Sequence, residues 1–484
     1  MDEHITRALA ALGAGAILAG FGLAGASGAT ARIHRAAGTA AAMTSAAKPG
    51  AQLWVRRFAG PANQDSRAAA VQVSPGGRKV FVTGTSGAAA ATIAYNAITG
   101  ARLWLARYAG PGEKGASASS VAVSPGGGRV FVAASTADAA GADYATIAYS
   151  AATGAPIWQA LYNGPGNGAD RAVSLAASPD GRTVYVTGLS KGRISGADYA
   201  TVAYSAATGK QLWVARLGGT GTDVARSVAV GPGGARVLVT GSSEGRASGA
   251  DYATVAYNAA TGKRQWVSRY NGPTRTEAAS DVASSVAVSP GGGIVFVTGT
   301  SSQASGGRLT AAATIAYSAA TGRRMWLTRY TGQAGDGAGA SMIAASPAGG
   351  VVLVTGYSGV VLSATNYATI AYNALTGKRM WLRIYDGPAH SYDVASSLAV
   401  SPGGSTVFVT GLSVGGTPDY ATVAYRAATG AQLWARRYNG PANGEDFATS
   451  VAVGTGGSRL FVTGVSAESR AVSDYLTIAY QAAS

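Results

Sequence analysis

Residues 251–266 read DYATVAYNAATGKRQW, and copies of this stretch recur along the chain every 50 to 60 residues. Every tryptophan of the protein occupies the closing position of one copy: Trp54, Trp104, Trp158, Trp213, Trp266, Trp326, Trp381 and Trp434. A period of this length is typical of a repeat array, in which neighbouring units share one continuous core. The chain of 484 residues is therefore expected to form one array and not several independent domains.

Each unit holds four short runs of apolar and β-branched residues. In the fifth unit they are residues 285–288, 294–299, 313–317 and 325–330. Turns rich in Pro and Gly separate the runs, because Pro presets φ and Gly supplies positive φ. Four antiparallel strands at this period make a blade of a β-propeller. The sequence predicts an all-β fold, an eight-bladed β-propeller over residues 51–484.

The two ends of the repeat region complement each other. Residues 51–58 contain only a fourth strand, and residues 474–480 contain only a third strand. We expect the N-terminal strand to complete the last blade, which would leave the ring without a free sheet edge.

Two resemblances follow from these motifs. The pattern D-Y-A-T-[IV]-A-Y, followed by G-x-x-x-W-x-x-R-Y-x-G-P and V-F-V-T-G, resembles the bacterial exported β-propeller repeat called SBBP, whose name refers to seven blades. A seven-bladed ring is therefore the alternative. The segment 256–266 is also similar to the tryptophan-docking motif of eight-bladed quinoprotein dehydrogenases. That resemblance implies that the tryptophans hold blades together. It would also imply a site for pyrroloquinoline quinone and calcium in the ring centre.

The N-terminus has the features of an export signal. Arg7 precedes an Ala, Leu and Gly run over residues 8–26, and small residues permit cleavage after Ala26 or after Ala31. We expect residues 1–31 to be a signal peptide, with an uncleaved membrane anchor as the alternative, and residues 32–50 to be a flexible leader. The protein is then secreted to the cell envelope, and the mature chain has no transmembrane span.

The sequence lacks the side chains that several kinds of catalysis require. The chain has no Cys, which excludes disulfides and thiolate sites. Of its three histidines only His390 belongs to the propeller, so a Ser-His-Asp site and a zinc site of His ligands are not expected. A quinoprotein's paired cysteines are missing as well. We expect no enzyme activity and no cofactor.

Acidic residues recur at two positions of the repeat. One set stands just before the first strand, at Asp170, Asp223, Asp281, Asp393 and Asp446; the other stands just before the third strand, at Asp143, Asp198, Asp251, Asp419 and Asp474. An Arg three residues after Trp reaches the same edge of the ring, as Arg216 does near Asp198. We interpret the sets as ion pairs within blades and turn caps. Calcium or substrate carboxylates are the alternative, if the side chains converge.

The positive charge is sorted by loop. Turns between strands one and two, and between strands three and four, open on one edge, which we call the cationic rim. They carry Arg78, Lys79, Arg102, Arg129, Arg182, Lys210, Arg236, Lys263, Arg264, Arg323, Arg324, Lys378, Arg379, Arg426 and Arg459, against the single acid Asp180. All of these except Arg102 and Arg426 form the candidate anion-binding rim. Loops on the opposite edge, the variable rim, differ in length and mix both charges.

This sorting suggests what the protein binds. The rim accounts for most of the formal net charge of +16, and clustered Lys and Arg favour an anionic polymer or surface. We expect an exported, monomeric, non-catalytic binding or scaffold module for anionic polysaccharide or another envelope polymer, or for protein partners. A solvated, merely solubilising face is the competing interpretation. A quinone-dependent dehydrogenase and an envelope protein-assembly scaffold are the alternative functions. Nucleic acid is disfavoured, because no aromatic residues alternate with the cations.

Overall fold

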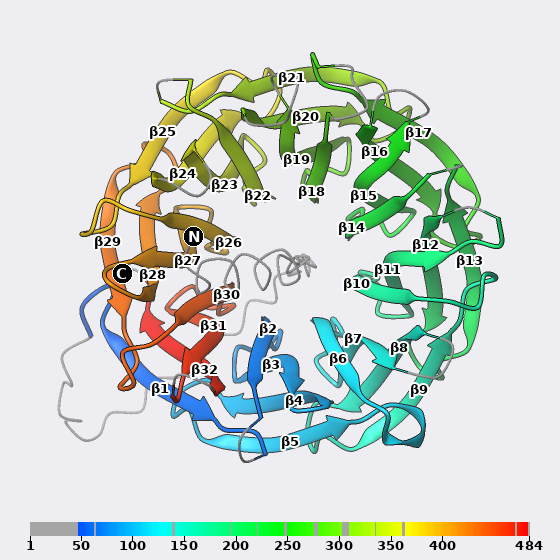
Figure 1. Cartoon of the computed structure of the whole chain (residues 1–484), viewed down its shortest axis with the longest axis horizontal. Coiled ribbons are helices and arrows are strands. Elements are labelled where there is room, and N and C mark those ends of the chain that lie inside the picture. The colour runs from blue at the N-terminus through cyan, green and yellow to red at the C-terminus, as the bar shows by residue number, and fades with distance from the viewer. Residues whose placement is uncertain are drawn as a thin grey trace, which may run out of the picture.

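The protein is an eight-bladed β-propeller. The computed structural model describes residues 47–61, 64–137, 141–194, 196–219, 221–245, 249–274, 279–302, 309–333, 335–360, 364–469 and 472–482. Within these ranges, eight four-stranded antiparallel sheets stand as blades around a central axis (Figure 1). The prediction of eight blades is confirmed, and the seven-bladed alternative is wrong. The predicted signal at 1–31 lies outside the described residues, as does the predicted leader up to residue 46.

The strands follow one another from the axis outward in every blade. Blade 1 consists of β2 (Ser66–Val73), β3 (Lys79–Ser86), β4 (Ala89–Asn96) and β5 (Arg102–Tyr108), and blade 2 of β6 (Ala116–Val123), β7 (Arg129–Ala137), β8 (Ala142–Ser150) and β9 (Pro156–Tyr162). Blade 3 consists of β10 (Asp170–Ala177), β11 (Thr183–Lys191), β12 (Ala197–Ser205) and β13 (Gln211–Leu217), and blade 4 of β14 (Asp223–Val230), β15 (Arg236–Gly245), β16 (Gly249–Asn258) and β17 (Arg264–Tyr270). A short 3-10 helix, η1 (Pro111–Glu113), lies between blades 1 and 2.

The second half of the ring repeats this order. Blade 5 consists of β18 (Asp281–Val288), β19 (Ile294–Ser302), β20 (Thr310–Ser318) and β21 (Arg324–Tyr330), and blade 6 of β22 (Ala338–Ala345), β23 (Val351–Val360), β24 (Ala364–Asn373) and β25 (Arg379–Tyr385). Blade 7 consists of β26 (Asp393–Val400), β27 (Thr406–Val414), β28 (Pro418–Arg426) and β29 (Gln432–Tyr438), and blade 8 of β30 (Asp446–Val453), β31 (Arg459–Ala467), β32 (Ser473–Gln481) and β1 (Gln52–Phe58).

Ring closure follows the prediction. Strand β1 pairs antiparallel with β32, in a register that runs from Gln52 opposite Tyr480 to Phe58 opposite Tyr475. Contacts begin slightly before the predicted boundary at residue 51, because the Gly50 N–H donates to the Gln481 carbonyl at 2.8 Å. The first strand in sequence thus completes the last blade.

Each tryptophan joins its blade to the next one. The indole N–H of all eight donates to an alanine carbonyl of the following blade at 2.8–3.3 Å. The indole also lies against the Gly that ends the turn of that blade, as Trp213 does against Gly262. A Cβ on Gly262 would lie 2.6 Å from the indole, and its φ is +70°. Glycine is therefore required for both the close approach and the backbone conformation.

Buried hydroxyl groups add a second set of bonds between blades. The Tyr hydroxyl of the DYAT motif donates to a backbone carbonyl in the third strand of the following blade, as Tyr199 does to Ala253 at 3.1 Å. Nearer the axis, Ser174 accepts from the Val228 N–H of the next blade at 3.3 Å. Because bonds of this kind recur around the ring, the blades are held in a fixed mutual position, and the loops stand on a rigid support.

Candidate functional site

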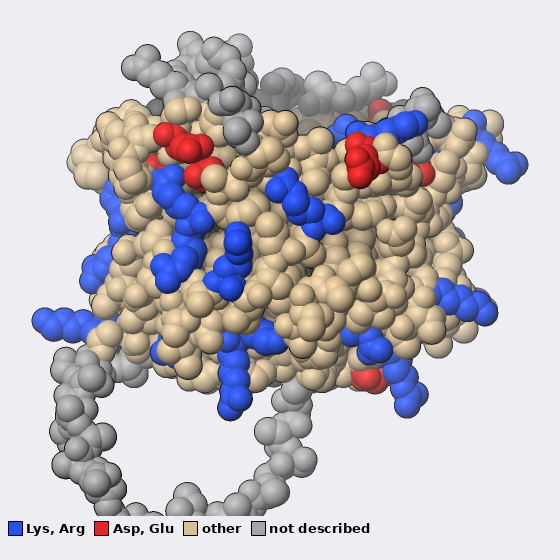
Figure 2. Space-filling model, turned by 90° about the horizontal axis from the view of Figure 1, so that it is seen from below, with Lys and Arg blue, Asp and Glu red and all other residues tan. Residues whose placement is uncertain are grey.

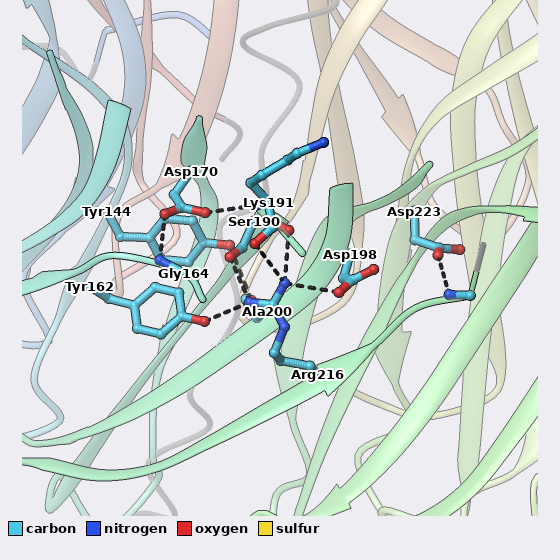
Figure 3. A network of polar contacts seen from close by, with 11 residues as sticks. Tyr144, Tyr162, Gly164, Asp170, Ser190, Lys191, Asp198, Ala200, Arg216 and Asp223 are labelled. Atoms are coloured by element: carbon cyan, nitrogen blue, oxygen red, sulfur yellow. Dashed lines mark hydrogen bonds and ion pairs between the residues drawn. The ribbon is translucent and has the colours of Figure 1, made fainter. Parts of the chain in front are cut away.

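Arg216 organises a polar network on the variable rim of blade 3 (Figure 3). Its guanidinium donates to Asp198 at 2.9 Å, to Ser190 at 2.7 Å and to the Tyr162 hydroxyl of the preceding blade at 2.8 Å. The predicted pairing of Asp198 with Arg216 is confirmed. The side chains of this pair are 12% and 23% exposed, so the network ties two blades together in a partly dry environment.

The same pairing recurs in blades 7 and 8, where Asp is again the second residue of the third strand. Arg437 donates to Asp419 at 2.7 Å, and Arg57 lies 3.8 Å from Asp474. In blades 1 and 5 an alanine, Ala89 or Ala311, stands at the equivalent position. The corresponding arginines there bond to the serine of the second strand, Arg107 to Ser86 and Arg329 to Ser301, as Arg216 also does to Ser190.

The aspartates of the first strand cap the adjoining loops. The Asp170 carboxylate accepts the Gly164 N–H at 2.6 Å and the Lys191 N–H at 2.9 Å (Figure 3). Asp281 holds two backbone N–H groups in the same way, from Gly272 and Ser302. These buried carboxylates are thus used by the backbone of their own blade and of the loop that enters it. In the described part of the chain, no three His, Cys, Asp or Glu residues are grouped to hold a metal ion.

Burial makes the carboxyl group of Asp446, at the same position in blade 8, harder to ionise. Desolvation raises the pKa of Asp446 above 3.8, against hydrogen bonds from Ser466 and Gly440 that lower it. A carboxyl whose pKa rises on folding stabilises the fold fully below pH 3.8, and this contribution disappears as pH increases through the folded-state pKa. The stability contributed by Asp446 therefore decreases from acid toward neutral pH.

Replacing Asp446 by Asn should remove this part of the pH dependence. Asn keeps an oxygen for the Gly440 N–H and stays neutral throughout, so we expect a flatter dependence of unfolding free energy on pH than in the parent. Urea unfolding between pH 3 and 7 measures it. Asp180→Asn is the control: hydrogen bonds lower the pKa of that exposed carboxyl, so its loss should change the slope in the opposite direction. An Asp446→Asn slope equal to the parent's would contradict the assignment.

The turns that carry the cationic-rim residues open on one edge of the ring. Strand order places the turns after strands one and three on the same edge of every blade. In Figure 2, Lys and Arg project from the lower edge of the ring, whereas both charges occur near the upper edge, where most acidic side chains on that face lie. Eleven of the fifteen rim cations are exposed; the four at second-strand starts, Lys79, Arg129, Arg236 and Arg459, are half-buried. Among described residues, Arg182 alone of the fifteen has an ion pair, 4.0 Å from Asp180.

A central cavity opens on the variable rim and was not foreseen from the sequence. Its volume is about 1030 Å³, and first strands from several blades form its wall. Lys114, Arg171 and Arg226 line it, together with serine and threonine hydroxyls, whereas no lining residue in the described chain is acidic. A signal was present in the repeat, because Arg226 occupies a first-strand position that is Ser119 in blade 2 and Ser284 in blade 5.

The cavity and its surroundings do not fit the quinone and calcium that the resemblance raised. Calcium is bound by carboxylate and carbonyl oxygens, and the described lining contributes cations and hydroxyls without a carboxylate. His390 is remote from such a role: its side chain is 78% exposed and bonds to Asp386 at 2.8 Å. The Asp386 carboxylate raises the pKa of His390. As predicted, His390 is an exposed loop residue.

Comparison with known proteins places the chain among propellers of one family. The model of the family described as outer membrane protein assembly factor BamB matches residues 142–394 and 304–475. This match agrees with the quinoprotein-like docking motif, while the SBBP resemblance stays a prediction. Among curated proteins, none matches the sequence. Within the described residues, no helix has the length and apolar character to cross a membrane.

Solved structures share the fold at low sequence identity. Sqt1 from Chaetomium thermophilum is 12% identical, with a TM-score of 0.58, over 90% of this chain and 98% of that chain. The structure of Sqt1 bound to the N-terminus of the ribosomal protein L10 is 12% identical, with a TM-score of 0.55, over 86% of this chain and 97% of that chain. Quinohemoprotein alcohol dehydrogenase from Comamonas testosteroni is 14% identical, with a TM-score of 0.55, over 89% of this chain and 76% of that chain. At these identities the likeness concerns the fold alone.

Proposed function

Because the chain belongs to the family of the outer membrane protein assembly factor BamB, we propose that it is an exported, non-catalytic scaffold that binds an anionic envelope polymer through its cationic rim. One observation carries the proposal: the rim presents eleven exposed Lys and Arg side chains, and Arg182 alone among them pairs with an acid in the described chain. The rigid ring holds these charges at fixed spacing, so several can engage one polymer together.

The physical basis is the exchange of counterions. A polyanion that contacts several Lys and Arg releases its bound cations, which makes binding strong at low salt and weak at high salt. The turns that carry the charges are short and nearly identical between blades. Such a surface recognises charge density more than a particular sequence or shape, which suits a repetitive acidic polysaccharide.

Charge reversal on the rim tests the proposal. We expect Arg323→Glu with Arg324→Glu to elute from a polygalacturonate column at lower salt than the parent, with the log–log salt slope of binding reduced by about two. Lys263→Glu with Arg264→Glu, added to this pair, should abolish retention. Retention in salt gradients and titrations at several salt concentrations provide the measurements.

The matched control lies on the opposite rim. Lys191→Glu with Arg193→Glu makes the same change in net charge at two exposed positions, and should be retained like the parent. If both pairs of substitutions shift elution equally, net charge and not the rim governs retention, and the proposal fails. Stoichiometric, calcium-dependent binding of pyrroloquinoline quinone, followed by absorbance, would overturn the non-catalytic part.

A second candidate function places a partner protein on the variable rim. The family's description as an assembly factor favours it, as do loops that differ between blades on a rigid support. The propeller Sqt1, which has the same fold, binds the N-terminus of another protein. A photo-crosslinker at Arg193 should then capture a defined partner in the envelope, while one at Arg324 should not. Capture from Arg324 alone would argue against this arrangement.

A further inference from the structure

Arg226 is a half-buried cation that no described residue pairs with. It lies in β14 on the wall of the central cavity, and its Nε is buried and makes no hydrogen bond. No described residue forms an ion pair or hydrogen bond with its guanidinium, and burial lowers its pKa. Burying a charge costs free energy unless an opposite charge or hydrogen bonds compensate. The guanidinium of Arg226 is therefore free to take an anion that enters the cavity as its partner.

The repeat shows what Arg226 replaces. It sits at the β-bulge of the first strand, where the pairing of β14 with β15 shifts between Ala225 and Ser227. At the same bulge in blade 2, Ser119 donates to the Ala172 carbonyl of the next blade at 2.9 Å. Serine also occupies this position at Ser284. Blade 4 thus has a cation where a serine would serve the fold, which points to a role in the cavity.

The charges gather on one side of the cavity. Lys114 precedes β6, and Arg171 lies on β10, so these two and Arg226 come from three neighbouring blades. Figure 1 shows β6, β10 and β14 side by side around the axis, with β22 across from β6 and β26 across from β10. The lining residues Tyr357 and Tyr392 belong to blades 6 and 7. The cavity therefore has a cationic wall, a wall with tyrosines, and serine and threonine hydroxyls between them.

We infer that this cavity binds an anionic sugar, with its oxyanion on the guanidinium groups of Arg226 and Arg171. The hydroxyls suit hydrogen bonds to sugar hydroxyls, and the partly exposed ring of Tyr357 suits the apolar side of a sugar ring. A volume of about 1030 Å³ matches the upper range of small-molecule sites, which is enough for a short saccharide. The oxyanion is a carboxylate, as in a uronate, or a phosphate on the sugar. The site lies on the variable rim and is independent of polymer binding at the cationic rim.

Calorimetric titration of the full chain tests the inference. Trigalacturonate and glucose 6-phosphate are the anionic probes, and maltotriose is the neutral one. We expect saturable binding of at least one anionic probe and none of maltotriose; the anion that binds identifies the source of the oxyanion. Arg226→Ser should weaken binding roughly ten- to hundredfold, because bonds to a charged group are lost.

Controls separate a binding role from a structural one. Arg226→Ser installs the residue of the equivalent bulges, so the ligand-free variant should fold and unfold at a urea concentration no lower than the parent. The cationic-rim pair Arg323→Glu and Arg324→Glu should bind the probe like the parent. The inference is overturned if neither anionic probe binds saturably, if Arg226→Ser binds as tightly as the parent, or if it destabilises the ligand-free protein.

Discussion

Replacing Trp213 by alanine is expected to lower the free energy of unfolding by about 3–5 kcal/mol. The indole is 9% exposed, and its N–H donates to the Ala259 carbonyl of the next blade at 2.9 Å. Its ring contacts Gly262 and lies 5.7 Å from the ring of Tyr185 and 6.2 Å from that of Tyr257. Since Tyr185 and Tyr257 belong to adjacent blades, the substitution empties a site that both blades fill.

Urea unfolding followed by far-ultraviolet circular dichroism measures the loss. The adjacent Leu212 gives a matched control, because its side chain is 49% exposed and Leu212→Ala should change stability by about 0.5 kcal/mol or less. Trp213→Phe keeps an aromatic ring but not the N–H, so it should cost less than alanine does. Equal effects of Trp213→Ala and Leu212→Ala would show that the docking contact does not stabilise the ring.

Removing β1 is expected to have the second large effect, because it opens the ring. A chain that starts at residue 59 lacks Trp54 and Phe58, both buried, and leaves the edge of β32 without its partner strand. Loss of two buried aromatic side chains costs about 6–10 kcal/mol, and an exposed strand edge promotes association between chains. We expect a lower melting temperature and oligomers or aggregates in size-exclusion chromatography with light scattering.

A chain that starts at residue 47 is the control and should match the parent in both measurements, because it retains β1. Adding a peptide of residues 47–58 to the shortened chain should restore the monomer, since the peptide can pair with β32 as β1 does. A shortened chain that stays monomeric with an unchanged melting temperature would show that strand closure contributes little.

Much of the architecture could be predicted because it depends on local repetition. The period of the Trp motif yields the number of blades, and the incomplete repeats at residues 51–58 and 474–480 yield the closure. The pairing of Asp198 with Arg216 also follows from a short hairpin, in which sequence spacing fixes which residues face each other. Rim assignment follows from strand alternation alone. Each of these inferences needs only one blade and its neighbour.

Other features depend on how the blades meet. Lys79 belongs to the predicted anion-binding rim, yet its Nζ donates to the Ala151 carbonyl of the next blade at 2.8 Å, so part of its charge serves the fold. Nothing in the local sequence around Lys79 signals this, because the acceptor is 72 residues away. The exposed remainder of the rim is what the proposed polymer can reach.

The sequence by itself thus determined the ring, its closure and the division of charge between two rims, because these follow from the period and from strand alternation. Only the tertiary structure decided that Lys114, Arg171 and Arg226 share one cavity. These residues lie more than 50 positions apart, in three blades. A bulge at Arg226 also interrupts the two-residue alternation of β14, so its orientation could not be read from the strand pattern. Closing the ring brings the three charges together.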